Sequence, residues 1–221
     1  FWVLDIILYP EYKNIVIRPV FIVGQPRSGT TFLHRTLASD TNNFLAIKHI
    51  EWLKSKYPNV RMTQVNLTPV FESLLEALPN VDDEESRLMS LANTRARLRM
   101  TSLYYFAALE NLLVAGTGNK VEDFGVGFYT KYGDGGVDIS PIADLLKTEV
   151  YELAKIIGVN SDILKAPPTD GLWGDSRTDE DQIGASYPEL EWAIHMKDLG
   201  KTPSDFNGRE KEVFDIFMDY N

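Results

Sequence analysis

Residues 112–120 read Leu-Leu-Val-Ala-Gly-Thr-Gly-Asn-Lys, a short apolar run that leads into a glycine-rich turn. A wholly apolar run of this length is typical of a central parallel strand, because both faces of such a strand are buried. Ligands of α/β sheets bind beyond the carboxyl ends of the strands, which is where Thr117 falls. The stretch therefore predicts a strand at 112–115 with a ligand site at its end.

A second glycine cluster lies downstream, where residues 130–138 read Thr-Lys-Tyr-Gly-Asp-Gly-Gly-Val-Asp. Seven of the 15 glycines of the chain fall within residues 116–136. Glycine adopts positive φ readily and lets the backbone approach a ligand closely. Tight turns explain either cluster alone equally well, whereas both clusters together favour a site that wraps a phosphate-bearing or nucleotide ligand.

Hydrophobic patterns predict alternating strands and helices along the rest of the chain. Strands are expected at 16–24, 60–67 and 112–115. Helices are expected at 31–39, 44–57, 84–109, 141–158, 187–199 and 210–220, with a loop over 167–174. Alternation of this kind predicts an α/β fold, a layered and mostly parallel sheet with helices on both faces.

Composition limits the classes of function that need to be considered. A chain of 221 residues can bury one sizeable core, and its net charge of −10 argues against a nucleic-acid surface. The apolar run at 1–9 is too short to span a bilayer and contains Asp5, so no membrane partner is expected. Without cysteine, the chain has no disulfide, no thiolate metal site and no Cys nucleophile. It looks like an internal fragment of a soluble protein.

Residues 49–221 contain a series of motifs whose order and spacing resemble those of one enzyme family. The motifs are Asn93–Met100 (NTRARLRM), Gly116–Lys120, Phe128–Asp138, Pro141-Ile142, Lys147, Pro167-Pro168-Thr169, Gly171-Leu172 and Thr178–Asp181. This region resembles the ammonia-dependent NAD synthetases, which form an amide through an adenylated intermediate.

The resemblance implies an adenine nucleotide alpha hydrolase-like fold, a cytoplasmic homodimer and a two-step reaction. ATP adenylates the carboxylate of deamido-NAD with release of pyrophosphate, and ammonia then gives NAD and AMP. Mg²⁺ supports the first step by neutralising phosphate charge. The implied roles are deamido-NAD binding for Arg99, Lys131 and Asp138, ATP binding for Thr117, Lys147 and Thr169, and Mg²⁺ binding for Glu122.

The residue types also suit this chemistry without the family. Arginine and lysine bind polyanions, and a carboxylate near a triphosphate suits a hard cation. Taken singly, Glu122 is more often a solvated surface carboxylate, and Lys147 could be a snorkelling lysine. Arg95 and Arg99 share one helix face while Arg97 lies on nearly the opposite one, so all three cannot point into one site.

The first quarter of the chain departs from this family. The family's Ser-Gly-Gly-x-Asp-Ser loop, which binds pyrophosphate and magnesium, occurs nowhere in the sequence. In its place, residues 24–34 read Gly-Gln-Pro-Arg-Ser-Gly-Thr-Thr-Phe-Leu-His, which resembles the phosphosulfate loop of sulfotransferases. That resemblance implies the donor PAPS, bound by Arg27, Ser28, Gly29, Thr30 and Thr31.

The chain is therefore expected to be composite. Residues 1–48 carry a net charge of +2 and form a sulfotransferase-like strand–loop–helix segment, while residues 49–221 carry −12 and form an NAD synthetase-like domain truncated at both ends. A fusion, a recombinant or a sequence-assembly artefact joined between Asn42 and Leu53 would explain this. Three functions follow: an NAD synthetase-like ligase impaired by the missing loop, a PAPS-dependent sulfotransferase, or a non-catalytic nucleotide-binding module.

Overall fold

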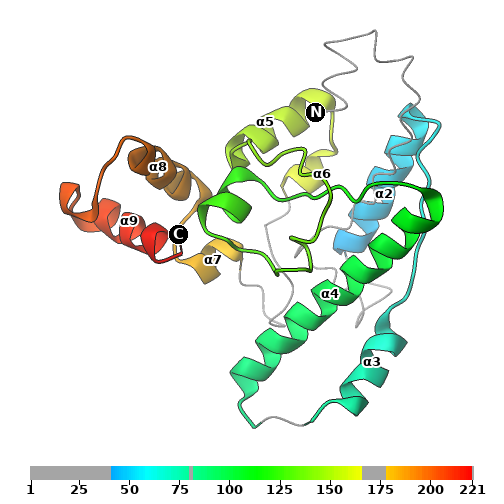
Figure 1. Cartoon of the computed structure of the whole chain (residues 1–221). Helices are drawn as coiled ribbons and strands as arrows, with labels where there is room; N and C mark the ends of the chain where they lie inside the picture. Colours follow the sequence, from blue (N-terminus) through cyan, green and yellow to red (C-terminus); the bar gives the residue numbers. More distant parts are fainter. Residues whose placement is uncertain (1–40, 80–81, 166–177, 221) are drawn as a thin grey trace.

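The computed structural model describes residues 41–79, 82–165 and 178–220 (Figure 1). In chain order its elements are α2 (Thr41–Lys56), α3 (Thr68–Ala77), α4 (Glu84–Glu110), the π-helical turn η3 (Lys120–Gly125), α5 (Lys147–Ile157), α6 (Ser161–Leu164), α7 (Asp179–Ile183), α8 (Tyr187–Asp198), the 3₁₀ turn η4 (Pro203–Asp205) and α9 (Gly208–Tyr220). No helix among the described residues is long and apolar enough to cross a membrane.

The main hydrophobic core lies where α8 packs against α9, η3 and α5. It consists of apolar side chains from four elements and the segments next to them: Val121, Val126, Ile183, Ala185, Tyr187, Leu190, Ala193, Ile194, Val213, Phe214 and Phe217. The ring of Trp192 meets those of Phe206 and Phe214 edge to face, with centroids 4.9 and 6.3 Å apart. Such pairs add to the burial of their apolar area and fix the angle between α8 and α9.

Helix α4 lies apart from this core and carries fewer buried side chains. Figure 1 shows α3 beside the N-terminal half of α4, where the Arg95 guanidinium lies 4.3 Å from the centroid of the Phe71 ring. At its other end, Glu110 accepts a hydrogen bond from Arg61 at 3.0 Å, and the chain leaves the helix through Asn111 with φ of 55°. Asparagine tolerates this left-handed conformation better than most residues do.

The expected sheet is not formed by the described residues. Their only β pairing is one parallel bridge between Ala115 and Ile139, so the strand predicted at 112–115 is reduced to that bridge. The strand predicted at 60–67 is wrong: residues 61–66 form no regular secondary structure and are exposed, with no buried face. The strand at 16–24, the helix at 31–39 and the loop at 167–174 fall outside the described residues.

The helices were predicted more accurately. Helices α2, α4, α8 and α9 match the predictions at 44–57, 84–109, 187–199 and 210–220 within about three residues. The helix predicted from Pro141 begins only at Lys147, because Ser140 and Pro141 open a turn instead of a helix. As predicted, it ends at Gly158, which adopts φ of 83°.

Candidate functional site

A lysine and a glutamate meet in a part-buried position between η3 and α5. The Asn119 side chain accepts hydrogen bonds from the backbone N–H groups of Val121 at 2.9 Å and Glu122 at 3.1 Å, which starts η3. The Lys120 N–H binds the Leu145 carbonyl at 2.9 Å and so brings η3 to the start of α5. As a result Lys147 Nζ lies 2.6 Å from Glu122 Oε1, and each side chain is only 18% exposed.

A buried tyrosine completes this cluster from α8. The Tyr187 hydroxyl lies 2.8 Å from Glu122 Oε1 and 3.3 Å from Asp179 Oδ2, while its ring centroid lies 4.8 Å from Lys147 Nζ. Burial and the two neighbouring carboxylates raise the pKa of Tyr187, so its hydroxyl keeps its proton and acts as a donor. Lysine, glutamate, aspartate and tyrosine thus form one hydrogen-bonded polar cluster at the edge of the core.

Helix α8 also fixes the start of α5, where Lys147 is the first residue. Glu191 accepts hydrogen bonds from Thr148 N at 2.9 Å and Thr148 Oγ1 at 2.7 Å. The Leu146 N–H donates a hydrogen bond of 2.8 Å to Glu149 Oε2. These carboxylates satisfy N–H groups that a helix N-terminus leaves without partners, and this explains why α5 begins at Lys147 and not at Pro141.

Thr117 lies between the bridge at Ala115 and the turn η3. Its hydroxyl is buried and has no hydrogen-bond partner within the described part of the chain. Buried hydroxyls almost always have a partner, so a group of this kind suits a ligand atom. Contact of Thr117 with ATP stays a prediction.

The glycine-rich segment 130–138 is a series of tight turns held against α4. Thr130 Oγ1 binds Asn93 Oδ1 at 2.6 Å, and Arg97 Nε donates to the Lys131 carbonyl at 3.1 Å. A Cβ atom at Gly133 would lie 2.8 Å from Ala96 Cβ, so glycine is needed there for close packing on the helix. The positive φ in this segment belongs to Tyr132, at 61°, and to none of its glycines.

The residues expected to bind deamido-NAD have separate surroundings. Burial, and after it the neighbouring charge of Arg95, lower the pKa of Arg99 to about 10, with Asp134 acting in the opposite direction. Asp138 accepts hydrogen bonds from the Val114 N–H at 2.8 Å and the Tyr104 hydroxyl at 3.0 Å. Lys131 is exposed, with its ammonium 5.1 Å from the centroid of the Tyr132 ring.

The three arginines of α4 likewise have different partners. Arg95 stacks on Phe71 of α3, whereas Arg97 and Arg99 interact with residues 131 and 134 of the glycine-rich segment. The expectation that Arg97 lies opposite Arg99 is therefore wrong, since both interact with the glycine-rich segment while Arg95 contacts α3.

Magnesium is compatible with this site through a single carboxylate. The described residues contain no group of three or more His, Asp or Glu side chains that could hold a metal on their own. Mg²⁺ is commonly bound by one or two carboxylates together with substrate phosphates and water. Glu122 fits a metal ion that arrives with a nucleotide through Oε2, since Lys147 and Tyr187 both contact Oε1.

Other predicted site residues lie outside the described part of the chain. They are Thr169 of the expected ATP site and the whole phosphosulfate loop, Arg27, Ser28, Gly29, Thr30 and Thr31. In the other direction, sequence reasoning assigned no role to Asn119, Asp179, Tyr187 or Glu191. The motif at 178–181 was the one signal near Asp179.

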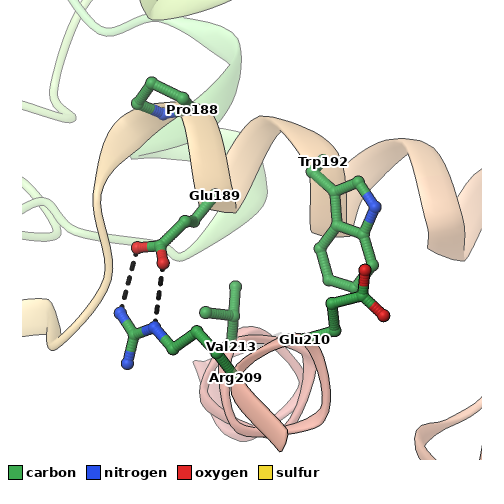
Figure 2. Close-up of a pocket in the computed structure, with 6 residues that line it drawn as sticks. All are labelled: Pro188, Glu189, Trp192, Arg209, Glu210 and Val213. Atoms are coloured by element: carbon green, nitrogen blue, oxygen red, sulfur yellow. Dashed lines mark hydrogen bonds and ion pairs between the residues drawn. The ribbon is translucent and has the colours of Figure 1, made fainter. Parts of the chain in front are cut away.

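A shallow groove of about 280 Å³ lies between α8 and α9, away from this cluster (Figure 2). Glu189 and Arg209 face each other across it through two parallel hydrogen bonds of 2.8 and 3.0 Å. Its other lining residues are Pro188, Trp192, Glu210 and Val213. None of the predicted site residues lines the groove, so we place the candidate site at Lys147 and Glu122 instead.

Comparison with known proteins connects this geometry to one family. The sequence model described as NAD synthase matches residues 22–215. The NH(3)-dependent NAD(+) synthetase of Carboxydothermus hydrogenoformans is 44% identical over 133 residues, which are 60% of this chain and 54% of that protein. The chain thus spans about half the length of the curated relatives that it matches.

Two solved structures share the fold. The NMN synthetase of Francisella tularensis aligns with a TM-score of 0.64 and 31% identity, covering 80% of this chain and 67% of that one. The NH3-dependent NAD synthetase of Campylobacter jejuni, solved with a nitrate ion, aligns with a TM-score of 0.62 and 21% identity, covering 96% and 87%. This likeness is consistent with the α/β class predicted from the sequence.

The comparisons bear differently on the two resemblances. None of the relatives and structures described above is a sulfotransferase, and the family match begins at residue 22, ahead of Arg27. The sulfotransferase resemblance and the donor PAPS therefore gain no support. The family match continues from residue 22 to residue 215, through the polar cluster and the glycine-rich segment, and the chain belongs to the NAD synthase family.

Proposed function

We propose that this chain is an NAD synthetase-like ligase that adenylates deamido-NAD with ATP and amidates it with ammonia. The products are NAD, AMP and pyrophosphate. The observation that carries the proposal is the contact of 2.6 Å between Lys147 and Glu122, within a chain that matches the NAD synthase family over residues 22–215. The two residues expected to serve ATP and its metal ion lie together, although 25 positions separate them in the sequence.

ATP is assigned to the charged side chain of Lys147 and to the hydroxyl of Thr117. Lys147 supplies a positive charge for the phosphates, and Thr117 offers a buried hydroxyl to the nucleotide. Glu122 is the ligand for Mg²⁺, which supplies neutralisation of the phosphate charge when bound. Thr169 is assigned to ATP by the family resemblance alone.

The deamido-NAD side is assigned to Arg99, Lys131 and Asp138. Arg99 is a part-buried arginine of α4, and Lys131 is an exposed cation of the glycine-rich segment. Two positive groups suit a dinucleotide with a pyrophosphate and a free carboxylate. Asp138 accepts one hydrogen bond on each carboxylate oxygen, from Tyr104 on Oδ1 and from Val114 on Oδ2, and each oxygen can accept a further bond from a substrate group.

The expected turnover is low. The family loop Ser-Gly-Gly-x-Asp-Ser has no counterpart in the sequence, so one phosphate-binding wall and one carboxylate for magnesium are not provided by that motif. Electrostatic stabilisation of transferred phosphoryl and adenylyl groups is usually a large part of catalysis. The absence of this loop is therefore expected to reduce adenylation more than it reduces ATP binding.

The test is an incubation of the whole chain with ATP, Mg²⁺, ammonium and deamido-NAD. We expect NAD and AMP in equal amounts, formed only when ammonium is present and lost in the Glu122→Gln variant. A parallel reaction with the mononucleotide substrate checks the narrower reading suggested by the Francisella NMN synthetase. If neither dinucleotide nor mononucleotide gives ammonium-dependent AMP, the proposed function is wrong.

A homodimer is part of the same proposal. Several large apolar side chains of α3 and α4 are exposed: Val70, Leu78, Met89, Tyr105 and Leu109. Exposed apolar residues grouped on neighbouring elements are typical of association surfaces. Light scattering during size-exclusion chromatography should give twice the chain mass of 25.0 kDa, and a stable monomer at micromolar concentration would contradict it. A cytoplasmic location remains a prediction.

A further inference from the structure

Glu122 shares one carboxylate oxygen between two donors. Oε1 lies 2.6 Å from Lys147 Nζ and 2.8 Å from the Tyr187 hydroxyl. The side-chain hydrogen bonds that Glu122 accepts from the described residues both end on this oxygen, so Oε2 is the oxygen left for another ligand. In this arrangement the two residues expected to bind the nucleotide and its metal ion neutralise each other.

This pairing conflicts with the roles that the proposed function gives to Lys147 and Glu122. An ammonium and a divalent cation repel each other when they share one carboxylate, so a metal ion bound to Glu122 weakens the contact between Glu122 and Lys147. Lys147 therefore has to turn from Glu122 to the nucleotide when the metal ion arrives. Since the Glu122 side chain is only 18% exposed, its carboxylate would then depend on whatever donor remains.

Tyr187 is the donor that remains. Its ring is buried in the core with 4% exposure, and its backbone N–H binds Glu180 Oε1 at 2.8 Å, so the residue is fixed on α8. Its hydroxyl carries no charge and does not repel a cation. The hydroxyl has one proton, and Glu122 at 2.8 Å is a nearer acceptor than Asp179 at 3.3 Å.

We propose that Tyr187 is a positioning residue for Glu122, whose hydroxyl holds the carboxylate in place while Lys147 exchanges it for the nucleotide. The inference rests on the proposed function. Groups behind a metal ligand orient it, and their loss typically weakens metal binding by about 10- to 100-fold. A Tyr187 that served only the core would affect all ligands alike, whereas a positioning Tyr187 affects only binding that needs the metal ion.

The experiment measures the dissociation constant of ATP by calorimetry, once with Mg²⁺ and once with EDTA. For Tyr187→Phe we expect the value with Mg²⁺ to rise about tenfold or more, and the value with EDTA to stay within about twofold. The matched control is Tyr151→Phe, because the Tyr151 ring lies 6.0 Å from Lys147 Nζ and its hydroxyl has no hydrogen bond to the described residues. Both constants should be unchanged in the control.

A double-mutant cycle ties the effect to Glu122. In the Glu122→Gln background, Tyr187→Phe should no longer alter the dependence of ATP binding on Mg²⁺. Equal losses with Mg²⁺ and with EDTA, or no loss at all, would overturn the role of Tyr187. If the unmodified chain fails to bind ATP under either condition, the proposed function falls and this inference falls with it.

A second variant keeps the test valid if Tyr187→Phe does not fold. Asp179→Asn leaves the tyrosine in the core and removes the negative charge of the competing acceptor at 3.3 Å. The hydroxyl should then always donate to Glu122. The dissociation constant of ATP with EDTA, divided by the constant with Mg²⁺, should therefore stay the same or increase. A ratio reduced to the level of Glu122→Gln would contradict the proposal.

Discussion

The polar cluster at Lys147 and the glycine-rich segment 130–138 organise their expected ligand residues in different ways. In the cluster, Lys147 and Glu122 contact each other directly and are supported from α8, within reach of the main core. In the segment, Asp138 binds Val114 and Tyr104 of its own chain while Lys131 is exposed. In the polar cluster the two charged residues expected to bind ligands form an ion pair with each other. In the glycine-rich segment Asp138, which is expected to bind a ligand, accepts a hydrogen bond from the backbone N–H of Val114.

The largest expected effect comes from removing Lys147. Lys147→Ala leaves part-buried Glu122 and buried Asp179 as neighbouring carboxylates without the ammonium, and it removes a charged contact to the phosphates. Losing a hydrogen bond to a charged group weakens binding by about 10- to 100-fold, and we expect that loss in the affinity for ATP. Lys155→Ala, at an exposed position of the same helix, is the control and should bind normally. Normal ATP binding by Lys147→Ala would remove this region from the site.

The next effect tests whether Asp138 has a structural role without ligand. Asp138→Ala deprives the N–H of fully buried Val114 of its acceptor, and an unsatisfied buried donor costs about 1–3 kcal/mol. Urea unfolding in the absence of ligand should show this loss of stability. Tyr104→Phe removes only the hydroxyl bond of 3.0 Å and should cost about 1 kcal/mol or less. If Asp138→Ala is as stable as the unmodified chain, the contrast between the two regions disappears.

A somewhat smaller effect is expected at the glycines that face α4. A Cβ at Gly133 would meet Ala96 Cβ at 2.8 Å and Thr130 Cβ at 2.9 Å, neither of which can move without shifting backbone. Overpacking of this kind costs about 1–3 kcal/mol in the free energy of unfolding, which is the expected loss for Gly133→Ala. At Gly136 the nearest atom is Met100 Cγ at 3.0 Å, on a flexible side chain, so Gly136→Ala should cost less. The reverse order would contradict this account.

The sequence predicted elements whose pattern is local and missed those that depend on distant partners. Helices α4, α8 and α9 lie within about two residues of where the sequence predicted them, and Gly158 ends α5 as its residue type suggests. The start of α5 was placed six residues early, because a Ser-Pro pair opens turns as well as helices and the carboxylate of Glu191 lies far along the chain. The strand predicted at 60–67 does not form, because residues 61–66 are exposed and their apolar side chains do not pack on another element.

In the candidate site, too, the sequence indicated residues that belong to local motifs and missed those that depend on distant partners. Lys147 and Glu122 were selected through family motifs and were found together in the fold. Tyr187 had no such signal: its hydroxyl partner Glu122 is 65 positions away, and a tyrosine at the start of an apolar helix is most often a core residue. The glycines of 133–136 were read as ligand-facing, whereas Gly133 serves close packing on α4.

The smallest effect concerns how firmly α8 holds the polar cluster. The hydrogen bonds from Arg209, and after them those from Ser186, together lower the pKa of Glu189 to about 2. A depressed carboxylate pKa adds stability at pH values above the unfolded-state pKa of 4.5, and this stability is lost as the pH falls from there toward 2. Arg209→Met should therefore lower the melting temperature at pH 7 by about 2 °C or less, since the pair is exposed to solvent.

The difference between the unmodified chain and Arg209→Met should shrink as the pH is lowered from 5 to 2. Melting curves followed by circular dichroism at pH 7, 5, 4 and 3 measure this difference, and comparing two variants cancels the titration of other carboxylates. In a Glu189→Gln background the pH dependence of the difference should be reduced to the part that comes from Glu212, which lies 3.2 Å from Arg209. A difference that stays constant with pH would mean that Arg209 acts through the Gly184 carbonyl, to which it also donates at 3.0 Å, and that the capping carboxylate of α8 is held without it.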